Sequence, residues 1–109
     1  GAPVGDLRTL YRGLKMPAGL KPLGPLEATQ ATFVTGALPA VVRAALADEF
    51  DRLGCHTAWV ETDVARTERN GQRGLVMLYP TADTARDPEG RLLFAGVAPG
   101  SVAVRMVAL

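Results

Sequence analysis

Residues 39–79 constrain the fold more than any other stretch, because they join a helical pattern to two strand-like segments. Pro39 suits the first position of a helix, and Gly54 suits the position just after its last residue. Apolar side chains recur between these two residues at helical spacing, so the sequence predicts a helix over residues 39–53 with one buried face. The apolar positions are Leu38, Val42, Ala45, Leu46, Phe50 and Leu53.

Two strands are predicted after this helix, over residues 57–66 and 75–79. Asn70-Gly71 lies between them and is the strongest short signal for a two-residue hairpin turn, because both residues tolerate positive φ. The second strand is apolar on both sides, which predicts that it lies at the centre of the sheet or beneath the N-terminal segment. The turn would set Val64 opposite Met77 and Thr62 opposite Tyr79.

Three more segments have a strand-like composition. Residues 28–37 are rich in β-branched side chains, and residues 92–97 and 102–109 follow turn sequences that contain proline and glycine. These elements predict an α+β fold, with a four- or five-stranded antiparallel sheet and the long helix packed on one face. Cystatin-like, hot-dog-like and ferredoxin-like folds share such an order of elements, and no motif chooses among them.

The first 26 residues are expected to form an N-terminal arm before a single α+β domain over residues 27–109. Asp6 can cap a short helix over residues 6–14. Residues 16–25 contain three prolines, so we expect a connector without regular secondary structure there. The arm carries four basic residues and one acidic residue, a net charge of +3, which a solvated helix face explains.

Composition narrows the class of protein. The 109 residues carry a formal net charge of only +1, so the overall charge does not indicate a polyanionic partner such as a nucleic acid. The chain has no isoleucine and ten arginines against two lysines, a bias that resembles high-GC bacterial genomes. Cys55 is the only cysteine, which excludes an intrachain disulfide and fits a reducing compartment. No apolar run approaches the length of a membrane span, so a cytoplasmic location without membrane insertion is expected.

Catalytic, cofactor and metal sites are not predicted. Cys55 and His56 are adjacent, but neighbours in an extended segment point to opposite faces, so they cannot readily pair as nucleophile and base. His56 is the only histidine and Ser101 the only serine, which disfavours a zinc site and a serine hydrolase triad. No glycine-rich phosphate loop is present, so no nucleotide cofactor is expected. The residues therefore favour a protein that is not an enzyme.

Glu61 and Asp63 form the one suggestive acidic pair. As alternate residues of a strand they would share a face with Trp59, where two carboxylates can bind a hard cation or act as acid and base. The solvent side of an edge strand explains them more simply, since charges at an edge discourage aggregation of sheets.

A basic hairpin tip gives one alternative function. Arg66, Arg69 and Arg73 flank Asn70-Gly71 and are candidate contacts for a nucleic acid. Glu68 reduces the positive charge of this cluster. No aromatic residue lies among the arginines to stack on bases.

The leading functional hypothesis is association with another protein or with a second copy of the chain. The C-terminal segments are apolar on two faces, and one helix can cover only one of them. The other face must be covered by a partner, by an extended ligand or by the N-terminal arm alone. A hot-dog-type acyl-thioester enzyme is a further alternative, for which Glu49 is the only candidate acid that would point inward from the helix. The candidate interface residues are Phe94, Val102, Val104 and Met106.

Overall fold

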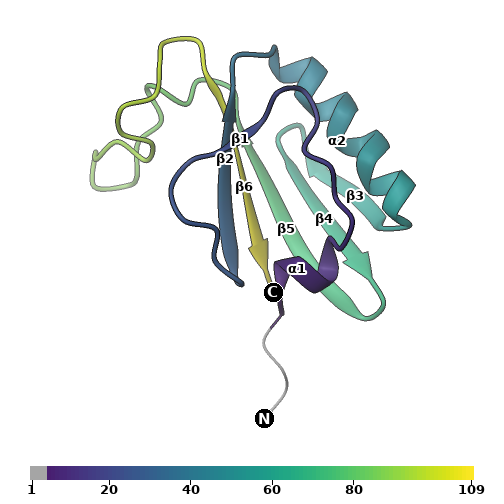
Figure 1. Ribbon diagram of the computed structural model, residues 1–109. Coiled ribbons are helices and arrows are strands. Elements are labelled where there is room, and N and C mark those ends of the chain that lie inside the picture. The colour runs from purple at the N-terminus through teal and green to yellow at the C-terminus, as the bar shows by residue number, and fades with distance from the viewer. Residues whose placement is uncertain (1–4) are drawn as a thin grey trace.

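The computed structural model describes residues 5–109, which contain two helices and six strands (Figure 1). The strands form one antiparallel sheet in the order β1-β2-β6-β5-β4-β3, so the predicted α+β class is confirmed. In chain order the elements are α1 (Leu7–Leu10), β1 (Lys21–Pro22), β2 (Gln30–Thr35), α2 (Pro39–Leu53), β3 (His56–Glu61), β4 (Val64–Arg69), β5 (Gln72–Tyr79) and β6 (Val102–Ala108).

The long helix α2 has the predicted bounds. It begins at Pro39 and ends at Leu53, and Gly54 follows in the left-handed conformation with φ of 78°. The amide of Cys55 donates to the carbonyl oxygen of Phe50 at 2.9 Å, which satisfies one of the helix's last acceptors. A glycine is suited to this position because a Cβ would be strained at positive φ.

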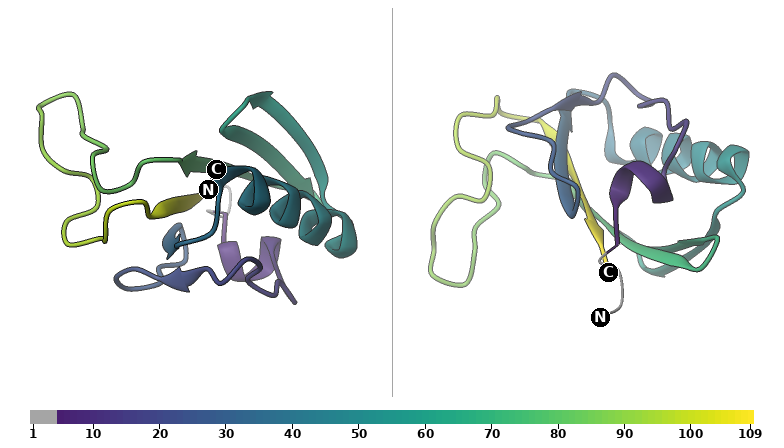
Figure 2. Two further views of the ribbon diagram at one scale, coloured as in Figure 1. Left: turned by 90° about the horizontal axis from the view of Figure 1, so that it is seen from above. Right: turned by 60° about the horizontal axis from the view of Figure 1, so that its bottom comes forward.

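The main core lies between the sheet and a layer made of α2 and the arm. Figure 2 shows α1, the connector and α2 on the same side of the sheet. Tyr11 of the arm stacks on Phe50 of α2, with ring centroids 5.3 Å apart, so the two covering segments also pack on each other. The fully buried side chains of this core include Leu10, Val42, Leu46, Phe50, Val76, Val102, Val104 and Met106.

The loop over residues 80–101 covers part of the opposite face and extends away from α2 (Figures 1 and 2). Its Phe94 is buried with Ala82 and with Ala103 of β6. The Phe94 ring meets Tyr79 edge to face at a centroid distance of 4.9 Å, and the guanidinium of Arg105 lies 5.2 Å from its centre. A small second core therefore anchors the loop.

The predicted strand over residues 57–66 is in fact two strands, β3 and β4, joined by a tight turn at Thr62-Asp63. The Asn70-Gly71 turn is confirmed, with φ of 52° and 80° at its two residues. Val64 pairs with Met77 as expected. The expected pairing of Thr62 with Tyr79 is wrong, because Thr62 lies in the turn and Tyr79 pairs with Ala103.

Residues 92–97 do not form a strand. Only an isolated bridge between Arg86 and Leu92 occurs there, because Phe94 is drawn into the small core and Gly96 turns the chain with φ of 82°. The turns on either side are as expected: the amide of Gly90 donates to Asp87 and that of Ser101 donates to Ala98.

The arm is also more ordered than its prolines suggest. Lys21 and Pro22 pair with Val34 and Phe33 of β2, which proline permits at the edge of a sheet. The first helix covers only Leu7–Leu10 instead of residues 6–14. The sheet therefore has six strands where four or five were predicted.

Candidate interaction surface

The two edges of the sheet differ in how they are protected. At one edge, β1 is only two residues long and contains Pro22. The arm continues along the neighbouring strand β2, since the amides of Leu23 and Glu27 donate to Thr32 and Gln30. At the other edge, β3 spans six residues and pairs with β4 on one side only. Among residues 5–109, β3 is the one long strand with a free outer edge.

The side chains of β3 are largely accessible. Trp59 is exposed on the strand, and Val60 beside it exposes 50% of its surface. His56 and Ala58 are also exposed, whereas Thr57 is half-buried. A strand with free main-chain groups and an exposed tryptophan combines two features that recur in protein interfaces.

A bulge changes the expected arrangement of the acidic pair. Trp59 lies opposite Ala65 and Glu61 lies opposite Val64, so the register shifts between them. Trp59 and Glu61 consequently point to opposite faces of the sheet, and the expectation that they share a face is wrong. Asp63 lies in the turn instead, with Oδ1 3.4 Å from Nε of Arg43 on α2. No group of residues suited to holding a metal ion occurs within residues 5–109.

The four candidate interface residues lie in the interior. Val102, Val104 and Met106 face α2 and the arm, and Phe94 lies in the small core under the 80–101 loop. The arm and the 80–101 loop therefore cover the apolar faces that a partner was expected to cover. A partner cannot reach these four side chains on the folded chain.

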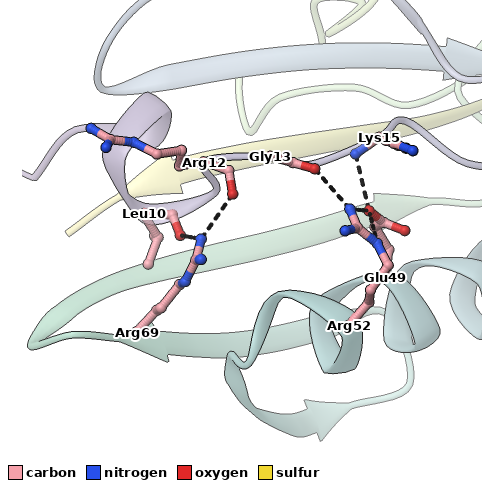
Figure 3. A network of polar contacts seen from close by, with 7 residues as sticks. All are labelled: Leu10, Arg12, Gly13, Lys15, Glu49, Arg52 and Arg69. Carbon is pink, nitrogen blue, oxygen red and sulfur yellow. Dashed lines mark hydrogen bonds and ion pairs between the residues drawn. The ribbon is translucent and has the colours of Figure 1, made fainter.

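The three arginines that are candidate contacts for a nucleic acid do not share one face of the sheet. Nη1 of Arg69 donates to the carbonyl oxygens of Leu10 at 3.3 Å and Arg12 at 3.0 Å, so this guanidinium holds the end of α1 (Figure 3). Arg66 and Arg73 are exposed on the opposite face of the sheet, where Glu68 lies directly across from Arg73.

Glu49 and Arg52 of α2 bind the arm at a second place (Figure 3). Arg52 donates to the carbonyl oxygen of Gly13 at 2.7 Å and to the Glu49 carboxylate. That carboxylate also accepts from the Lys15 amide at 3.0 Å. These donors, Arg52 first, hold the pKa of Glu49 below its usual range. Glu49 therefore binds the arm's main chain, and its side chain exposes only 13% of its surface.

Cys55 and Tyr11 are buried near each other without forming a catalytic pair. Burial raises the pKa of the Cys55 thiol, although the charge of Arg69 partly opposes this. Burial likewise raises the pKa of Tyr11 to about 12, and the Tyr11 hydroxyl lies 2.6 Å from the Thr67 hydroxyl. A thiol whose pKa is raised forms less of the reactive thiolate at neutral pH, and His56 beside it is exposed.

Sequence reasoning indicated an edge strand at Glu61 and Asp63 but treated residues 57–66 as one strand, so it missed that only β3 forms the edge. The signal was present in Thr62-Asp63, two residues that are common in turns.

Comparison of the chain with protein-family models, with curated proteins and with solved structures found no match. Neither helix of residues 5–109 is both long enough and apolar enough to cross a membrane.

Proposed function

We propose that the protein is an association module that binds a second copy of itself through the outer edge of β3. The observation that carries this proposal is the contrast between the two edges of the sheet. The β1 edge is short and contains a proline, whereas β3 offers main-chain donors and acceptors to an added strand.

A single free edge determines the kind of assembly. Pairing of β3 with β3 of a second copy is isologous, so a two-fold axis closes the dimer. The two sheets then continue as one antiparallel sheet, and each copy's other edge remains closed by β1. Growth into a filament needs a second free edge, which the described chain does not offer.

The pairing surface is small, and its strength is expected to be modest. The bulge between Trp59 and Glu61 interrupts the regular strand, so His56–Trp59 is the part best suited to a ladder. Trp59 and Val60 add apolar area on either side of that ladder. We therefore expect a dimer that dissociates on dilution, as small interfaces do.

The test is the solution mass measured by light scattering over a concentration series. The unmodified protein should move from monomer to dimer as its concentration rises. Val60→Lys should stay monomeric, because a lysine at an exposed edge strand opposes strand pairing and removes the apolar side chain beside the ladder. Val41→Lys is the matched control, since Val41 on α2 exposes 51% of its surface against 50% for Val60. A protein that is monomeric at every concentration, or a dimer unaffected by Val60→Lys, contradicts the proposal.

A further inference from the structure

A cavity of about 330 Å³ lies between the arm and strand β2, near the β1 edge of the sheet. Phe33 of β2 and Met106 of β6 line it from the sheet, and Leu14 and Met16 line it from the arm. This volume falls within the range of sites that hold small organic ligands. Most of its lining is apolar, and methionine side chains adapt readily to ligands of different shape.

The cavity has two charged residues in its lining, Arg8 and Glu27. The Arg8 side chain exposes 81% of its surface, and its one ion pair is with the neighbouring carboxylate of Asp6 at 3.2 Å. An ion pair this exposed is weak, so the guanidinium can exchange it for another anion. Glu27 accepts a hydrogen bond from Gln30, which holds it on the side of β2.

The chain segment that supplies most of the cavity's lining carries a net positive charge. Residues 5–27 contain four basic residues and two acidic ones, a net charge of +2. This field favours a ligand whose polar end is negative. The apolar interior of the cavity in turn favours a ligand whose other end is a hydrocarbon.

We propose that this cavity binds a medium-chain aliphatic carboxylate, with the chain between the arm and β2 and the carboxylate at Arg8. Arg8 is suited to the carboxylate because a guanidinium can donate two parallel hydrogen bonds to it. The proposal is independent of dimer formation, because the cavity lies by β1 and β2, at the edge of the sheet opposite β3.

Hexanoate, octanoate and decanoate, each below its micelle concentration, are the probes. The methyl resonances of the methionines provide the readout, since Met16 and Met106 line the cavity and Met77 does not. The Met16 and Met106 signals should shift and saturate, while the Met77 signal stays in place. Affinity should rise by about fourfold for each added methylene until the cavity is filled.

Two variants test separately the binding of the ligand's hydrocarbon and the binding of its carboxylate. Leu26 lines the cavity and exposes 59% of its surface, so Leu26→Asp should keep the fold and abolish binding. Leu38→Asp is its control, because Leu38 is exposed at the start of α2. Arg8→Gln should weaken decanoate binding by about tenfold and leave binding of the uncharged 1-decanol unchanged.

Several results would overturn the proposal. These are shifts that do not saturate, a Met77 shift as large as that of Met16, or unchanged binding by Leu26→Asp. Equal binding of decanoate by the Arg8→Gln variant and the parent would show that Arg8 does not hold the carboxylate, which also overturns it.

Discussion

Gly74 of β5 lies directly against Tyr11 of the arm. A Cβ placed on Gly74 would come within 2.6 Å of the Tyr11 hydroxyl oxygen and of Cδ2 of Leu10, and within 2.9 Å of the Thr67 hydroxyl. Both arm residues are buried, so neither can move aside freely. The close approach of the arm to the sheet therefore depends on the missing side chain at this position.

Gly74→Ala should loosen the arm. The added methyl must displace Leu10 or Tyr11, which we expect to reduce the free energy of unfolding by about 1–3 kcal/mol. Chemical denaturation measures this loss. Gly36→Ala is the control, because a Cβ at Gly36 meets no atom within 4 Å. Equal stability of the two variants would show that the arm does not pack as described.

Arg69→Gln should free the end of α1. The substitution removes a charged donor to the carbonyl oxygens of Leu10 and Arg12, which we expect to cost about 1–2 kcal/mol. Hydrogen exchange of the arm amides should become faster. Arg73→Gln, an exposed change in the same hairpin, should leave arm exchange unchanged. If the two variants behave alike, Arg69 does not hold the arm.

Tyr11 should make stability fall at alkaline pH. Its pKa is raised to about 12 by burial, whereas the tyrosine of an unfolded chain ionises near pH 10. Between these values the unfolded state loses its proton first, so stability is full below about pH 10 and declines as pH rises toward 12. Denaturation at a series of pH values measures the slope. The slope should be shallower in Tyr11→Phe than in the parent; identical slopes would contradict this account.

Local signals explain which elements could be predicted from the sequence. The bounds of α2 follow from Pro39 and Gly54, and the β4–β5 turn follows from Asn70-Gly71, because each signal acts within a few residues. The short run Leu92-Leu93-Phe94 gave no such guidance. An apolar run of this length suits either a strand or a loop that covers a core. In the structure Phe94 packs with Ala82 and Ala103, contacts that depend on the tertiary fold.

The roles of individual side chains were harder to predict than the elements. Arg69 looks like a surface cation in a basic hairpin, yet it holds carbonyl groups 57 and 59 residues earlier in the chain. Met106 and Val104 look like uncovered apolar surface until the arm is placed over the sheet. Such contacts depend on tertiary packing, which the pattern of a single sequence does not contain.

The most direct test of the central claim is amide hydrogen exchange of β3 at low and at high protein concentration. If β3 pairs with a second copy, the outward-facing amides of His56–Trp59 should exchange more slowly at high concentration, while the Lys21 amide, the one amide of β1, exchanges at the same rate. The same exchange rate for β3 at every concentration, or protection that appears only elsewhere, would contradict association through this edge.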